Sequence, residues 1–176
     1  MIVNLCRSEM AIAEQAAKLR WQLARASGVE NKKIDKTRTD QDIDMLGICA
    51  EIAFSKLFDL DFNASALGID SGGDVYIPCG SSEMCVQIKS TFHKTGNLLL
   101  TNHDKMIWDI AVLVTKGDAI NSFNVFGFIS NEKAKKVEVK KDLGHGLGRF
   151  IDKSDLSDMS VLWDFLMKRK YEGINI

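Results

Sequence analysis

Four polar side chains stand in parts of the sequence that otherwise read as core, and their types suit metal or phosphate chemistry. Asp74 heads the extended run GDVYIP, and Gln87 and Lys89 lie inside the run MCVQIKS. Glu51 is the only charged residue of the apolar stretch ICAEIAFS, residues 48–55. A buried carboxylate or ammonium is costly unless it is paired or holds a metal. These four residues therefore need partners or a function.

The two extended runs predict a β-hairpin that gathers three of these side chains. Residues two apart on a strand share a face, so Gln87 and Lys89 point to the same side. A turn centred on residues 80–81 would place Asp74 opposite Gln87, with Lys89 as a neighbour across the strands. Glu51 would be the fourth member if its helix packs on the same sheet.

The charges of this group leave two interpretations. Lys89 can pair with Glu51 or Asp74 in a structural ion-pair network. Two acids outnumber one base, however, and a hard cation would neutralise the remaining negative charge. Magnesium prefers a few carboxylates, a carbonyl oxygen and several waters. Glu51, Asp74 and the backbone carbonyl of Ile88 could supply the protein's share of that shell.

The composition bounds the class of protein. The 176 residues fit one domain, and 45% hydrophobic with 27% charged residues is typical of a globular protein. A formal net charge of −1 gives no long-range attraction to nucleic acid, so such binding needs local patches. The sequence contains no apolar run long enough for a membrane helix and no secretion signal at its start. Its four cysteines form no CxxC pair and indicate reduced thiols in a cytoplasmic protein, without zinc or disulfides.

Helices are expected before the hairpin and at the end of the chain. The first, residues 8–27, is expected to bury the side that carries Ile12, Ala16, Leu19 and Leu23. The second, residues 42–58, is apolar nearly all round, which indicates a buried helix. A helical tail is expected at about residues 155–170.

Strand patterns fill the middle of the chain. Besides the hairpin, FNASALGI (a weak pattern, residues 62–69), NLLLT and NSFNVFGFIS can form strands. MIWDIAVLVT, residues 106–115, is almost continuously apolar, as in a central strand covered on both faces. SNEKAKKV predicts a helical turn, and DLGHGLGRF, residues 142–150, a glycine-rich loop. The order of elements predicts an α/β (α+β) domain with a central sheet.

The ordered motifs resemble the PD-(D/E)XK nuclease superfamily, the fold of many restriction endonucleases and Holliday junction resolvases. That family has a glutamate on a core helix, an aspartate opening a strand, and an acidic residue, a spacer and a lysine on the next strand. Here LGICAEIAFSKLF, GGDVYIP and VQIKS follow in that order, with the apolar strand WDIAVLV after them, over about residues 42–130. Each motif is short, and the ordered set is more specific than any one of them. The resemblance implies a restriction endonuclease-like central mixed sheet flanked by helices.

The resemblance also implies a metal-dependent nuclease that hydrolyses phosphodiester bonds in nucleic acid, expected to be DNA. Glu51 and Asp74 would hold Mg²⁺ or Mn²⁺ with the Ile88 carbonyl, and Lys89 would position or activate the attacking water. Gln87 departs from the family, which has an acid there. Its side-chain carbonyl can still bind a metal, but one negative charge is lost. This departure bears on metal affinity and on whether a second ion binds.

Three residues that follow the motif lysine within five positions are candidate substrate contacts: Ser90, His93 and Lys94. Three other functions remain open. A four-way-junction resolvase would use the same residues and act as a homodimer, through the first helix or the tail VLWDFLM. A non-catalytic domain would bind nucleic acid or a partner protein, and a plain α/β domain would keep the charges as a structural network. A partner protein could also supply targeting to DNA.

Overall fold

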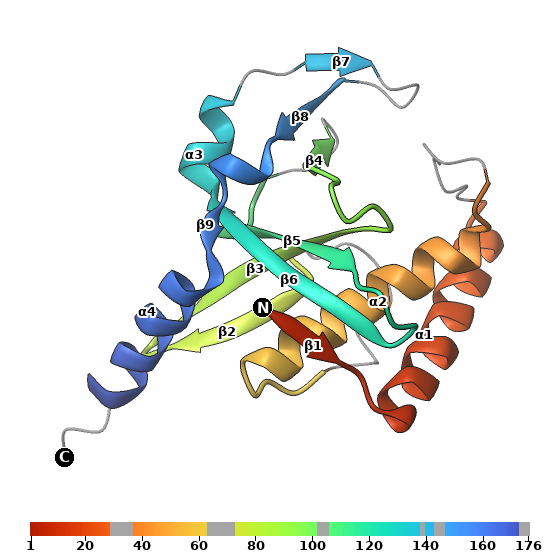
Figure 1. The fold of residues 1–176 in the computed structure, drawn as a ribbon, viewed down its shortest axis with the longest axis horizontal. Helices are drawn as coiled ribbons and strands as arrows, with labels where there is room; N and C mark the ends of the chain where they lie inside the picture. Colours follow the sequence, from red (N-terminus) through yellow and green to blue (C-terminus); the bar gives the residue numbers. More distant parts are fainter. Residues whose placement is uncertain (29–36, 63–72, 102–105, 138–139, 143–146, 173–176) are drawn as a thin grey trace.

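A six-stranded mixed sheet forms the centre of the computed structural model, which describes residues 1–28, 37–62, 73–101, 106–137, 140–142 and 147–172 (Figure 1). The strand order is β1-β6-β5-β3-β2, and β9 pairs with β6 beside this path. β3 and β5 run parallel, whereas the other neighbours are antiparallel. The strands are β1 (Ile2–Asn4), β2 (Val75–Cys79), β3 (Ser82–Thr91), β5 (Ile110–Lys116), β6 (Ser122–Ser130) and β9 (Ser157–Asp158).

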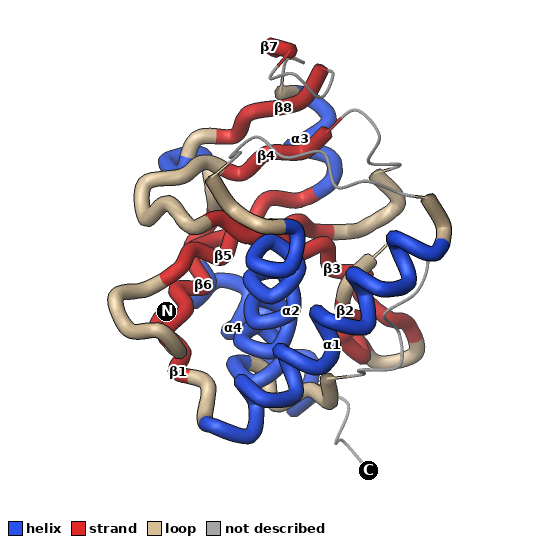
Figure 2. The backbone as a smooth tube through the Cα atoms, turned by 90° about the vertical axis from the view of Figure 1, so that its right-hand side faces the viewer, coloured by secondary structure: helices blue, strands red, loops and turns tan. Residues whose placement is uncertain are grey.

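Helices and a smaller sheet cover this centre. The three-stranded sheet has the order β4-β8-β7, with β4 (Leu98–Thr101), β8 (Leu147–Ile151) and β7 (Lys140–Asp142). The helices are α1 (Arg7–Ala26), α2 (Asp40–Leu57), α3 (Asn131–Lys136) and α4 (Met159–Glu172), and a 3-10 turn spans Lys153–Asp155. α2 packs between α1 and the large sheet (Figure 2). The predicted α/β class with a mixed sheet flanked by helices is confirmed.

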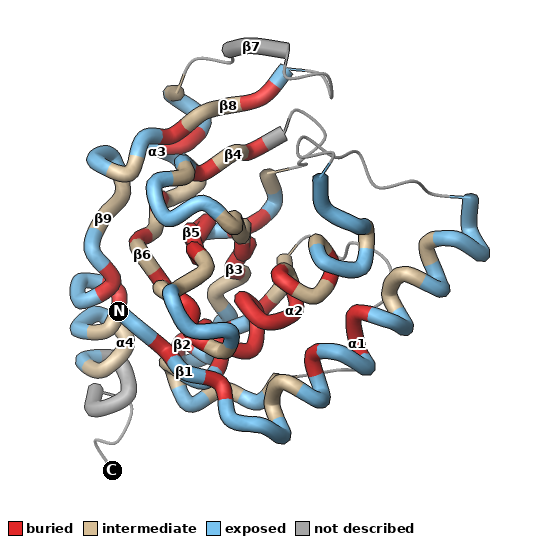
Figure 3. Tube along the Cα trace, turned by 45° about the vertical axis from the view of Figure 1, so that its right-hand side comes forward, coloured by how far each residue is buried: buried red, intermediate tan, exposed pale blue. Residues whose placement is uncertain are grey.

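The second predicted helix, α2, is the buried centre of the helical layer (Figure 3). It begins two residues earlier than residue 42 because Thr39 caps it. The Thr39 hydroxyl accepts from the Asp42 amide at 3.1 Å, and the Asp42 carboxylate accepts from the Thr39 amide at 2.9 Å. Such a reciprocal cap satisfies amides that the first helical turn leaves unpaired. Every residue from Ile48 to Ser55 is buried, as the nearly continuous apolar circumference predicts.

The first helix buries a different side from the one expected. Ala13, Ala16 and Ala17 are its buried residues. Ile12, Leu19 and Leu23 are exposed to 45%, 46% and 46%, so the predicted face is wrong except for Ala16. The alanine side is the one that packs on α2, because small side chains let two helices approach closely. Periodicity alone could not choose between the two sides.

Strand β5 is central and covered on both faces, as its apolar sequence predicts. Val112 and Val114 belong to the core under α2, and Ala111 and Leu113 to the core under the smaller sheet. The strand begins at Ile110, not at residue 106. Met106 has a positive φ of 49°, which breaks the extended conformation.

Further differences from the sequence analysis concern short elements. The expected loop at residues 142–150 becomes β8 from Leu147 onward, because this segment pairs with β4. β1 has no pattern of its own and exists through its pairing with β6. The weak strand at residues 62–69 lies, apart from Phe62, outside the described residues. Within the described ranges, no helix has both the length and the apolar character needed to cross a bilayer.

Candidate metal centre

The hairpin of β2 and β3 places Asp74 opposite Gln87. Val75 pairs with Val86, which sets this register, and the turn is made possible by Gly80 with a φ of +67°. The Asp74 carboxylate oxygen Oδ2 accepts a hydrogen bond from Gln87 Nε2 at 2.5 Å. The opposition expected from the sequence is therefore present. Gln87 directs its amide nitrogen, not its carbonyl, to the aspartate.

Asp74 also lies at the edge of β3 that β2 leaves uncovered. β2 begins at Val75, so β3 continues past the start of its partner. The backbone amide of Ile88 points to this uncovered edge and donates to Asp74 Oδ2 at 2.6 Å. The amide and carbonyl of one strand residue face the same edge. The Ile88 carbonyl therefore faces the same side of β3 as its amide, the side on which Asp74 lies.

Glu51 enters from α2 and has a partner that the sequence analysis did not identify. Its residue exposure is 8%, and its carboxylate Oε1 accepts from Arg20 Nη1 at 3.2 Å and Nη2 at 3.1 Å. Arg20 lies on α1. The guanidinium passes over Gly47, one turn before Glu51, where a Cβ would make an ordinary contact of 3.7 Å with Arg20 Nη1.

The electrostatics link Glu51 to Asp74. Burial raises the pKa of Glu51 to about 7, Arg20 acts against this shift, and the negative charge of Asp74 adds to it. The charge of Asp74 thus disfavours the ionised form of Glu51. Like charges in a poorly solvated site favour a proton or a neighbouring cation, and Arg20 already supplies one positive charge to Glu51.

Lys89 lies on the face of β3 that points away from α2. Val86 and Ile88 belong to the core under α2, so Gln87 and Lys89 point away from that helix. Lys89 is half-buried. Glu51, on α2, is therefore on the opposite side of β3 from the side chains of Gln87 and Lys89.

The three candidate substrate contacts lie near the end of β3. Ser90 is half-buried within the strand, and His93 is exposed after it. The ammonium of Lys94 pairs with the carboxylate of Asp118, in the turn between β5 and β6. Lys94 is thus directed to that turn in the structure.

The oxygen donors predicted from the sequence would fit a hard divalent cation. Glu51 and Asp74 could supply two carboxylates, and the Ile88 carbonyl could supply a neutral oxygen. Mg²⁺ is typically held by one or two carboxylates and keeps several waters. Across the part of the chain that the structure describes, no three or more His, Cys, Asp or Glu side chains gather as a metal cluster. The oxygen-only donors suit Mg²⁺ or Mn²⁺ better than zinc, which favours nitrogen and sulfur.

Gly73 fixes the approach of the chain to this edge. A Cβ at Gly73 would lie 2.2 Å from Cys85 Sγ and 3.3 Å from the Val86 carbonyl oxygen. We expect Gly73→Ala to lower the free energy of unfolding by about 1–3 kcal/mol, as overpacking does. Urea denaturation of four proteins measures this: wild type, Gly73→Ala, Cys85→Ala and the double variant. The double variant should recover part of the loss, and a loss that Cys85→Ala leaves unchanged would contradict the packing explanation.

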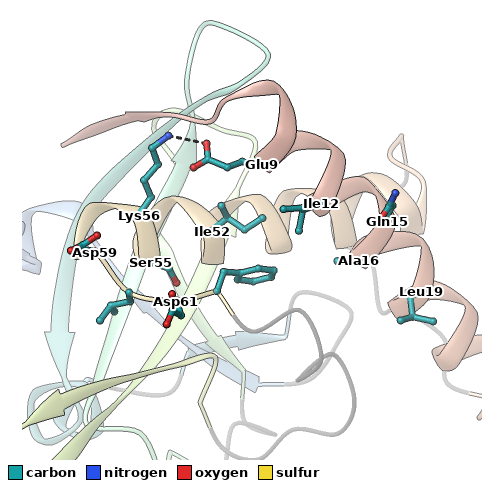
Figure 4. A pocket seen from close by; sticks show the side chains of 12 residues that line it. Glu9, Ile12, Gln15, Ala16, Leu19, Ile52, Ser55, Lys56, Asp59 and Asp61 are labelled. Atoms are coloured by element: carbon teal, nitrogen blue, oxygen red, sulfur yellow. Dashed lines mark hydrogen bonds and ion pairs between the residues drawn. The ribbon is translucent and has the colours of Figure 1, made fainter.

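A separate hollow lies between α1 and the end of α2 (Figure 4). Its volume is about 590 Å³, and Ile12, Leu19 and Ile52 are among the residues that line it. At its rim Lys56 Nζ contacts Glu9 Oε2 at 2.8 Å. Glu51, Asp74 and Lys89 are not part of its lining. The hollow is distinct from the edge of β3.

Comparison with known proteins gives no information on function, so the function is inferred from the residues of this chain. No protein-family model, curated protein sequence or solved structure matches this chain.

Proposed function

We propose that this protein is a metal-dependent nuclease that hydrolyses phosphodiester bonds in DNA. One observation carries the proposal: Glu51 is a carboxylate buried on the core helix α2, and the hairpin holds the carboxylate of Asp74 on the Ile88 amide of β3. The negative charge of Asp74 also raises the pKa of Glu51. Lys89 lies one residue after Ile88 on the same strand. This combination of two acids, a backbone carbonyl and a lysine matches the chemistry of phosphodiester hydrolysis.

Each residue has a defined part in the proposed reaction. Asp74, fixed by Gln87 and the Ile88 amide, and Glu51 would hold Mg²⁺ or Mn²⁺ together with the Ile88 carbonyl. A bound ion supplies Lewis acidity toward the phosphate and lowers the pKa of a water ligand. The Lys89 ammonium would orient the attacking water and stabilise negative charge that develops on the phosphoryl oxygens. Gln87 would keep the aspartate in place through its amide.

The fold we propose is the restriction endonuclease-like one. The parallel pair β3–β5, the hairpin β2–β3 and the buried helix α2 support it, because the resemblance implies a central mixed sheet flanked by helices. The free state of all four cysteines suits the reducing cytoplasm, where we place the activity. With a formal net charge of −1, binding to DNA would depend on local contacts.

A cleavage assay with a panel of substrates tests this function. Plasmid, linear duplex, single-stranded DNA and a four-way junction are incubated with the protein and Mg²⁺ or Mn²⁺. We expect cleavage that appears with metal and disappears with EDTA, because the two acids need the cation to act on a phosphate. Preference for the junction would identify a resolvase.

The same panel distinguishes the other functions. DNA binding without cleavage under any metal condition would contradict the nuclease and favour a non-catalytic binding domain. Neither binding nor cleavage would favour a structural charge network. A metal-independent activity would point to a contaminating enzyme or to different residues, and the variants discussed below separate these two cases.

A further inference from the structure

The guanidinium of Arg20 is hydrogen-bonded to the Glu51 carboxylate, which is also a proposed ligand of the metal. We propose that Arg20 competes with the divalent cation for Glu51 and keeps metal affinity low until a phosphate of the nucleic acid takes the arginine. This inference rests on the proposed function and adds a regulation of the same site. It assigns to α1, which lies outside the resemblance, a direct part in the chemistry.

The contacts of Arg20 indicate that it competes with a cation for Glu51, in addition to any structural role. Both terminal nitrogens converge on Glu51 Oε1, at 3.1 and 3.2 Å, and Nη2 lies 3.5 Å from Oε2. A cation that bound this carboxylate would meet a fixed positive charge in contact with it. Two positive charges close together in a poorly solvated site repel strongly. The arginine must therefore move, or the metal binds weakly.

The position of Arg20 makes such an exchange feasible. Its side chain is 31% exposed, whereas that of Glu51 is 10% exposed, so the arginine can turn to solvent while the glutamate cannot. Gly47 presents no side chain that would lock the guanidinium in place. Arginine pairs with phosphate through two parallel hydrogen bonds, in the same way as with a carboxylate. A DNA phosphate at the edge of β3 is thus a suitable second partner.

The test is the binding of Mn²⁺ alone, without DNA, to wild type and to Arg20→Met. Isothermal titration calorimetry and electron paramagnetic resonance of free Mn²⁺ at pH 8.5 give the dissociation constant. Removal of the competing charge should tighten Mn²⁺ binding by about tenfold or more. Arg20→Lys, which keeps the charge but loses the paired geometry, should fall between the two.

Two controls show whether the gain passes through this site. Arg25→Met removes the same charge from α1 at a residue that pairs with Asp40 instead, and should leave Mn²⁺ affinity close to that of wild type. In a Glu51→Gln background, Arg20→Met should not increase the affinity for Mn²⁺, because the carboxylate for which Arg20 and Mn²⁺ compete is absent. Thermal unfolding of each variant confirms that it is folded.

The outcomes separate the inference from the proposed function. Mn²⁺ binding that Asp74→Asn abolishes, but that Arg20→Met leaves unchanged or weakens, would overturn the competition and leave the metal centre standing. Absence of Asp74-dependent Mn²⁺ binding in both wild type and Arg20→Met would overturn both. A similar increase in Mn²⁺ affinity with Arg25→Met would show that any loss of positive charge from α1 has this effect. It would contradict a specific role for Arg20.

Discussion

Asp74→Asn is expected to lower the rate of Mg²⁺-dependent DNA cleavage by at least about a thousandfold, and Lys89→Met by at least about a hundredfold. The asparagine keeps the shape of the side chain but removes the negative charge that holds the cation. The methionine keeps the apolar stem of Lys89 and removes the ammonium that stabilises charge on the phosphate. Initial rates at saturating metal and substrate measure both effects.

Matched controls make this result specific to the site. Glu83→Gln removes an acid from an exposed position of β3, and Lys133→Met removes a lysine from an exposed position of α3. Both should cleave at rates close to wild type. Wild-type cleavage by Lys89→Met would remove the lysine from the mechanism. A folded Asp74→Asn that keeps full activity would contradict the metal centre itself.

Glu51→Gln is expected to abolish cleavage and, at high pH, to stabilise the protein. The pKa of Glu51 is raised from 4.5 to about 7 in the folded protein, mainly by burial. The folded state thus holds a proton that the unfolded state releases between these two values. Stability due to Glu51 is therefore greatest below pH 4.5, falls as the pH rises through this window, and stays low above pH 7.

The side-chain amide of glutamine does not ionise, so Glu51→Gln does not lose stability between pH 4.5 and 7. At pH 8.5 we expect the free energy of unfolding of Glu51→Gln to be higher than that of the wild type by about 2 kcal/mol. This corresponds to an increase of roughly 4–8 °C in melting temperature. The difference should vanish near pH 4.5, where both side chains are neutral. Differential scanning calorimetry between pH 4.5 and 8.5 measures it. A variant less stable than wild type at pH 8.5 would show that Glu51 is retained for its ion pair with Arg20, which favours a structural network.

The register of the hairpin could be predicted because its determinants are local. Gly80 permits the tight turn, and alternation along two short strands then decides which side chains face each other. The burial of α2 and β5 followed equally from continuous apolar sequence, which allows no other placement. Asp74, Gln87 and Ile88 therefore lie together at the edge of β3 as the motif order implied.

The parts that could not be predicted depend on contacts between distant segments. Arg20 and Glu51 are 31 residues apart, and only the docking of α1 on α2 brings them together. That docking uses the alanine side of α1, although Ile12 and Leu19 form an equally periodic and more apolar side. Nothing in the sequence next to Glu51 specifies which distant residue pairs with it.

The position of the metal can be measured directly. Crystals of wild type and of Arg20→Met are soaked in Mn²⁺, and anomalous data are collected at the manganese absorption edge. We predict an anomalous peak bounded by Glu51, Asp74 and the Ile88 carbonyl, and a stronger peak in Arg20→Met. Anomalous density elsewhere, or no peak at this edge of β3 in either crystal, would contradict it.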